Sequence, residues 1–144
     1  MPFVILATIC AGLFAGAAIY VTAVEHPARV ACGTALAVRE FGPSYRRGTI
    51  MQASLAVVGL VLAVVAWQRT GHGALLVGGL LLGSVVPFTL LVILPTNNQL
   101  LAPSLDPESG YAATLLRRWG WLHAVRSVLG ALAFGTLLVC LAQT

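Results

Sequence analysis

Two short stretches of the sequence hold the side chains that could carry chemistry. They contain a carboxylate, two imidazoles and two guanidinium groups, namely Glu25, His26, Arg29, His123 and Arg126. These side-chain types transfer protons, bind anions or coordinate metal ions. The first stretch directly follows residues 3–24, which carry no charge. Ionisable groups at the edge of such an apolar run indicate a functional site, although an arginine there can also simply reach for lipid phosphates.

The second stretch places its polar side chains on one side of a helix. Trp119, His123 and Arg126 are spaced four and three residues apart, which puts them on a common helical face. Residues 127–142 carry no charge and would span only about 24 Å as a helix. We therefore expect His123 and Arg126 at or inside the hydrocarbon boundary, facing the protein interior or a wet cavity.

The first stretch has two interpretations. Glu25 and Arg29 lie four residues apart and can neutralise each other as a structural ion pair. Pro27 lies between them and disfavours helical geometry at His26. We expect the helix to kink or to end at this point.

Composition identifies the solvent of the chain. Of its 144 residues 59% are apolar and 8% are charged, whereas soluble domains carry about 25% charged residues. The apolar segments are residues 3–24, 49–67, 74–94 and about 119–142. Each is near the ~20 residues that a membrane-spanning helix needs. We predict an all-α integral membrane protein, with residues 1–144 as a single antiparallel four-helix bundle. The first segment is longer than the apolar core of a signal peptide, so we expect it to be retained.

The links between the spans differ in length. Residues 67–74 form a tight turn, whereas residues 25–48 and 95–118 are long. Gly42 and Pro43 predict a turn within the first long link. Asp106, followed by Pro107 and Glu108, predicts the start of the last helix, which would then project beyond the membrane.

The distribution of arginine predicts the orientation of the bundle. The two long links hold six of the eight arginines, and the short link holds one, Arg69. The positive-inside rule then places the long links in the cytoplasm and both termini outside, in the plasma (inner) membrane. At the cytoplasmic end the bundle would gather the polar residues that flank the spans. These are Glu25, His26, Arg29, Tyr45, Gln52, Asn97, Trp119, His123 and Arg126.

Other patterns restrict the partners. Gly12 with Gly16, and Gly79 with Gly83, have the small-residue spacing of closely packed helices. We favour packing within the chain, and the same spacing also suits a homo-oligomer. No basic block is interleaved with aromatic residues, so nucleic acid is not an expected partner. Lipid is.

Four stretches resemble the anthrone oxygenase-like family of small four-span membrane proteins. They are residues 12–29, 45–55, 94–101 and 115–130, with the sequences GLFAGAAIYVTAVEHPAR, YRRGTIMQASL, LPTNNQLL and LLRRWGWLHAVRSVLG. The resemblance implies a hydrophobic aromatic substrate, an anthrone, that is oxidised by dioxygen to an anthraquinone. Because the anthrone methylene proton is acidic, a base suffices in principle and no flavin, nicotinamide or other cofactor is required.

On this resemblance, site residues receive roles as a hypothesis. His26 or His123 is the base and Glu25 orients a histidine. Arg126 and Asn97 stabilise the developing oxyanion, and Trp119 stacks on the substrate. Further substrate-binding residues are Arg29, Tyr45 and Gln52.

Two other classes of function stay open. Glu25, His26 and His123 could hold iron or copper, because two imidazoles and a carboxylate form a known ligand set, and the two histidines alone could hold haem. The embedded acid Glu25 could instead belong to a small transporter, and a non-catalytic assembly module is a further alternative.

Overall fold

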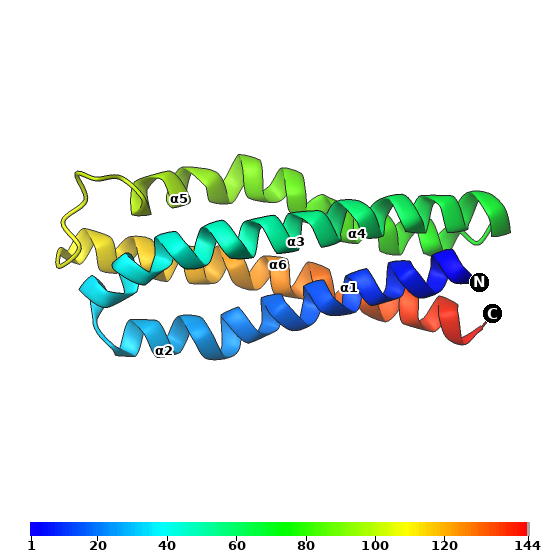
Figure 1. Cartoon of the computed structure of the whole chain (residues 1–144), viewed down its shortest axis with the longest axis horizontal. Coiled ribbons are helices and arrows are strands. Elements are labelled where there is room, and N and C mark those ends of the chain that lie inside the picture. The colour runs from blue at the N-terminus through cyan, green and yellow to red at the C-terminus, as the bar shows by residue number, and fades with distance from the viewer. Residues whose placement is uncertain (144) are drawn as a thin grey trace.

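Four long helical rods run antiparallel to one another and bring both ends of the chain to the same end of the bundle (Figure 1). This is a computed structural model, and it describes residues 1–143. The first rod consists of α1 (Pro2–Tyr20), η1 (Val21–Glu25) and α2 (His26–Ala31), and the second is α3 (Thr34–Thr70). The third consists of α4 (Gly73–Phe88), η2 (Thr89–Ile93) and α5 (Leu94–Leu100), and the last is α6 (Gly110–Ala142). All four rods are long and apolar enough to cross a membrane, which confirms the predicted fold class.

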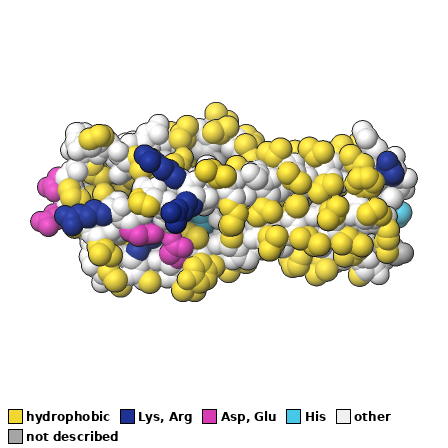
Figure 2. Space-filling view, in the orientation of Figure 1, with side chains coloured by type: hydrophobic (Ala, Val, Ile, Leu, Met, Phe, Trp, Pro, Cys, Tyr) yellow, Lys and Arg dark blue, Asp and Glu magenta, His cyan; other side chains and the backbone are white. Residues whose placement is uncertain are grey.

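The rods extend beyond the apolar segments that predicted them. The helical stretches that could span a membrane are Pro2–Ala31, Thr34–Thr70, Gly73–Leu100 and Gly110–Ala142. One half of the bundle is covered by apolar side chains, whereas most charged side chains gather on the other half (Figure 2). The apolar segments of the sequence therefore mark only the part of each helix that suits lipid.

The first long link is mostly helical, so the turn predicted at Gly42 and Pro43 is wrong. Both residues lie inside α3. The chain turns instead at Gly33, whose φ of 102° is accessible to glycine but strained for other residues. A proline in a helix removes one hydrogen bond, and the long α3 tolerates this loss.

The helix does not end at Pro27, so one of the two expected outcomes is wrong. His26 has helical angles, φ −65° and ψ −46°, and the rod continues to Ala31. The accommodation occurs one turn earlier, where η1 is a π-helix, and η2 likewise precedes Pro95. A proline ring clashes with the carbonyl of the fourth residue before it, and a wider π-turn can relieve that clash.

The last helix begins at Gly110 rather than at the predicted Asp106. Ser109 is its N-cap and accepts a hydrogen bond from the Ala112 backbone N–H at 3.1 Å. Asp106 instead accepts from the Glu108 N–H at 3.0 Å and so stabilises the preceding turn. As expected, the helix then runs unbroken, over 33 residues and about 50 Å.

Glycine brings α3 and α4 into close contact. A Cβ added to Gly79 would lie 2.7 Å from the Ala63 side chain, and one added to Gly83 would lie 2.7 Å from Leu60. This pair therefore serves packing within the chain. Gly12 approaches Phe134 in the same way, whereas Gly16 faces open space.

Candidate active site around Trp119

Trp119 is the centre of the polar half of the bundle. Its side chain is 6% exposed, and three aromatic rings surround it. The His123 ring stacks on it with centroids 4.7 Å apart, and the His26 ring lies at 5.0 Å. Phe41 meets it edge-on at 5.3 Å. The four-residue spacing on α6 produces the stack with His123, and His26 reaches the same indole from α2.

Two hydroxyl groups hold the His123 ring. Thr22 Oγ1 lies 3.0 Å from His123 Nδ1 and 2.8 Å from Ser127 Oγ, while Ser127 donates to the His123 carbonyl at 3.3 Å. Because a hydroxyl can donate or accept, this pair can serve His123 with Nδ1 protonated or unprotonated. Nε2 is then the nitrogen left for a ligand.

His26 is packed tightly against α6. Its side chain is 8% exposed, and its Nδ1 is buried with no hydrogen-bond partner among the described residues. A Cβ added to Gly120 would lie 2.8 Å from His26 Nε2. Only a glycine at this position leaves room for the imidazole.

A buried amide holds Arg126. Its Nη2 donates to Gln52 Oε1 at 2.8 Å, and the guanidinium lies over the Phe14 ring at 5.6 Å. Gln52 is 4% exposed. Arg126 is thus a fixed cation at the edge of the apolar half, with its Nε lacking a partner within residues 1–143.

Glu25 and Arg29 form the expected ion pair. Arg29 also binds Glu40 at 3.0 Å, and Ser44 donates to Glu25 at 2.8 Å, so the cluster joins α2 to α3. The Arg29 guanidinium lies 5.7 Å from the Trp119 ring. The hydrogen bonds of the Glu25 carboxylate in the described chain are therefore with Arg29 and Ser44, and its role in orienting a histidine stays a prediction.

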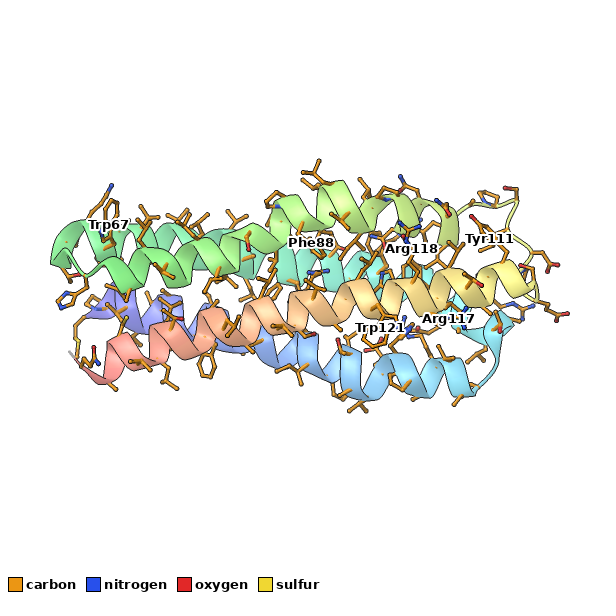
Figure 3. All side chains as sticks on the ribbon, turned by 180° about the vertical axis from the view of Figure 1, so that it is seen from behind. Trp67, Phe88, Tyr111, Arg117, Arg118 and Trp121 are labelled. Carbon is orange, nitrogen blue, oxygen red and sulfur yellow. The ribbon has the colours of Figure 1, made fainter. Side chains whose placement is uncertain are left out.

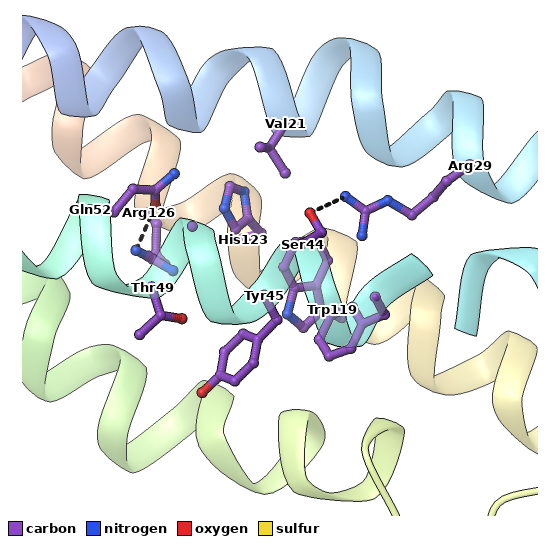
Figure 4. Close-up of a pocket in the computed structure, with 11 residues that line it drawn as sticks. Val21, Arg29, Ser44, Tyr45, Thr49, Gln52, Trp119, His123 and Arg126 are labelled. Atoms are coloured by element: carbon purple, nitrogen blue, oxygen red, sulfur yellow. Dashed lines mark hydrogen bonds between the residues drawn. The ribbon is translucent and has the colours of Figure 1, made fainter. Parts of the chain in front are cut away.

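A small cavity of about 50 Å³ lies between these groups (Figure 4). Six of the nine residues expected at the site line it: Arg29, Tyr45, Gln52, Trp119, His123 and Arg126. Tyr45 stacks on Phe41 with centroids 5.6 Å apart. Glu25 and His26 lie outside its wall. Asn97 does not line it either, although its side chain is 1% exposed and its Oδ1 has no partner in the described chain.

Sequence reasoning missed Thr22 and Ser127. Ser127 lies four residues after His123 and could have been found by helical spacing. Thr22 lies in the π-helix, where that spacing changes, so no signal in the sequence indicated it.

The metal alternative required Glu25, His26 and His123 to converge. Within residues 1–143 no three His, Cys, Asp or Glu side chains are grouped as a metal site. The two imidazoles contact Trp119, while the carboxylate contacts Arg29 and Ser44.

Comparison with known proteins gives consistent matches. A family model described as anthrone oxygenase matches residues 41–136. The chain is similar to anthrone oxygenase tpcL of Aspergillus fumigatus, with 36% identity over 99 residues, covering 63% of this chain and 62% of that protein. It is 34% identical to anthrone oxygenase AgnL2 of Paecilomyces divaricatus over 54% of this chain and 51% of the relative. It is 31% identical to anthrone oxygenase ptaC of Pestalotiopsis fici, over 62% of this chain and 74% of the relative. The match thus spans less than two thirds of the first two relatives, and no solved structure matches significantly.

Proposed function

Because the chain belongs to the anthrone oxygenase family, we propose that it is a membrane-embedded oxygenase that acts with dioxygen on an anthrone-like substrate or another aromatic polyketide or phenol. The three relatives described above are named anthrone oxygenases. The helices of this chain suit a bilayer, from which a flat and poorly soluble substrate can be collected.

The proposed reaction balances with dioxygen as the only oxidant. A base takes one proton from the substrate methylene, and the electron pair of that C–H bond moves into an aromatic oxyanion. The anion adds dioxygen at the same carbon to give a peroxide. Loss of the second methylene proton, with cleavage of the O–O bond, gives the quinone carbonyl and one water. The substrate supplies all four electrons, so the reaction as written needs no cofactor.

One observation carries the proposal: two buried imidazoles contact the same indole. An imidazole is suited to general-base catalysis near neutral pH. The hydroxyl pair of Thr22 and Ser127 supports His123 before and after it takes up a proton. These contacts make His26 and His123 the two candidates for the base.

Among the residues that line the small cavity, Arg126 is best placed to stabilise an anionic oxygen atom there. Preorganised donors act most strongly in sites that exclude water. Gln52 fixes the Arg126 guanidinium at the cavity, and His123 lines the same space. A volume of about 50 Å³ can hold small molecules such as dioxygen, because a single water needs about 10–15 Å³.

Substitution of the histidines tests the proposal. His26→Gln and His123→Gln keep polarity and approximate size, so both variants should remain folded in detergent. With an anthrone substrate, at least one should lose about 10²–10⁴-fold in turnover. Its residual activity should rise with pH, because the substrate then deprotonates unaided.

A third histidine provides the control. His72 is exposed in the turn before α4, at the far end of the bundle, so His72→Gln should retain full turnover. Folded and fully active variants at both His26 and His123 would refute the proposed base. Loss of bound iron, copper or haem from either variant, without rescue at high pH, would instead support the metal alternative.

A further inference from the structure

A second recess in the polar half lies between α2 and α6, on the outside of the bundle. It has a volume of about 600 Å³, whereas the cavity at His123 has about 50 Å³. Pockets for small organic ligands measure about 300–1,000 Å³. Three fused rings therefore fit the recess and not the cavity. We refer to it as the α2–α6 groove.

The groove has the lining expected for a flat aromatic ligand. Its walls are mostly apolar and include Val30, Ala113, Ala124 and Trp121. Trp121 is 75% exposed and Val30 is 44% exposed, so the groove opens outward. In Figure 3 the side chains of Trp121 and Arg117 lie on the side of α6 that is nearer to α2. Because α2 directly follows the uncharged residues 3–24, we expect the opening at the membrane edge, where amphipathic aromatic rings are enriched.

The polar residues of the groove are few. They are Thr22, His26 and Arg117. His26 lines the groove, and most of its imidazole is buried against α6. Thr22 in turn contacts His123, so it connects the groove to the ring that lines the inner cavity. In an apolar recess, a small number of polar groups like these fixes the orientation of a ligand.

Another groove, of comparable size at about 590 Å³, lies between α1 and α3, and we refer to it as the α1–α3 groove. Its lining includes the carboxylates Glu25 and Glu40, together with Arg47. Carboxylates oppose a substrate that becomes an oxyanion, because like charges repel. The α2–α6 groove contains no carboxylate and has a cation, Arg117, in its lining. The charges of the lining residues therefore favour the α2–α6 groove as the binding site of such a substrate.

We propose that the α2–α6 groove binds the hydroxylated polycyclic aromatic substrate, and that His26 is the base that meets its methylene carbon there. This inference rests on the proposed function. The C–H bond breaks, its proton passes to an imidazole nitrogen of His26, and its electron pair enters the ring system as an oxyanion. Dioxygen is then the oxidant, as in the reaction above.

Filling the groove tests the inference. Ala113 is an exposed residue of α6 that lines the groove, so Ala113→Phe should fold normally and occupy ligand space. We expect its KM for an anthrone to rise at least tenfold. The affinity for a hydroxyanthraquinone, measured by its absorbance in detergent without turnover, should fall by a similar factor. Ala124→Phe, at the other end of the recess, should give the same result.

Two variants serve as controls. Ala131→Phe adds the same ring to an exposed position of α6 in the apolar half, and Met51→Phe fills the α1–α3 groove. Both should leave KM and affinity unchanged. Unchanged binding in both Ala113→Phe and Ala124→Phe, or weakened binding in Met51→Phe alone, would overturn the inference while the activity of the unmodified protein stands. Absence of anthrone turnover by the unmodified protein would refute the proposed function, and hydroxyanthraquinone affinity would still report on the groove.

Discussion

At the scale of single residues, the site depends on groups that hold the two imidazoles in place. Thr22 is the most specific of these, because its hydroxyl contacts both His123 Nδ1 and Ser127. Thr22→Val removes the hydroxyl at nearly constant shape. Leaving a buried polar group without a partner costs about 1–3 kcal/mol. If His123 acts in turnover, kcat should fall about five- to a hundredfold. Thr136→Val, at an exposed hydroxyl of the same bundle, should keep kcat, and equal kcat values for both variants would contradict the role of Thr22.

A second prediction at this scale concerns Gly120. In a helix interior Gly→Ala normally stabilises by about 1 kcal/mol. Gly120→Ala should instead displace His26, since the new Cβ would lie 2.8 Å from its Nε2. We expect turnover to fall at least tenfold. Gly135→Ala in the same helix has no atom within 4 Å of its Cβ and should keep full turnover, so equal activity of the two variants would contradict the tight packing.

Sequence reasoning found many of the residues but not their contacts. His123, Arg126 and Trp119 were grouped correctly because they share one helical face, and Arg29, Tyr45 and Gln52 also reach the cavity. Asn97 was grouped with them because it follows the third span, yet it does not line that cavity. Proximity to the end of a helix did not decide which way this side chain points.

At the scale of elements, two π-helical segments set the rotation of the rods beyond them. η1 contains Thr22 and ends at the residue before His26. Pro27→Ala removes the ring that η1 accommodates, so the segment should relax toward a regular α-helix. We expect the variant to be as thermally stable as the unmodified protein, or more so, and yet to turn over substrate at least tenfold more slowly. Reduced stability with unchanged turnover would show that η1 does not position Thr22.

The prediction of elements succeeded where lipid dictates the pattern. Each predicted span lies within a helix, because an apolar run of about 20 residues in a bilayer has no other open-ended structure. It failed at Gly42–Pro43 and at Asp106, where local turn chemistry competes with packing of the helix extensions. Those extensions bury Phe41, Leu115 and Trp119 against one another, and single-residue preferences carry no information about that contact.

At the scale of the whole molecule, the arginines are divided unequally between the ends. The two termini lie together at one end of the bundle (Figure 1), and Arg69 in the last turn of α3 lies over the Phe3 ring at that end. The long links lie at the other end, where most charged side chains gather (Figure 2). A reporter that is active only in the cytoplasm, fused after Thr144, should therefore be silent, and one active only outside should be functional. The opposite pattern would reverse the orientation and place the candidate site at the outer face.

The proposed opening of the α2–α6 groove at the membrane edge has a kinetic consequence. If its ligand arrives through lipid, the relevant concentration is the mole fraction of ligand among lipids and not its molarity in water. Adding empty vesicles to a fixed amount of ligand would then dilute it in two dimensions and slow its capture, while the volume of the solution is unchanged. A product that is equally flat and apolar would leave sideways and compete for the same opening, so the surrounding bilayer acts at once as reservoir and as sink.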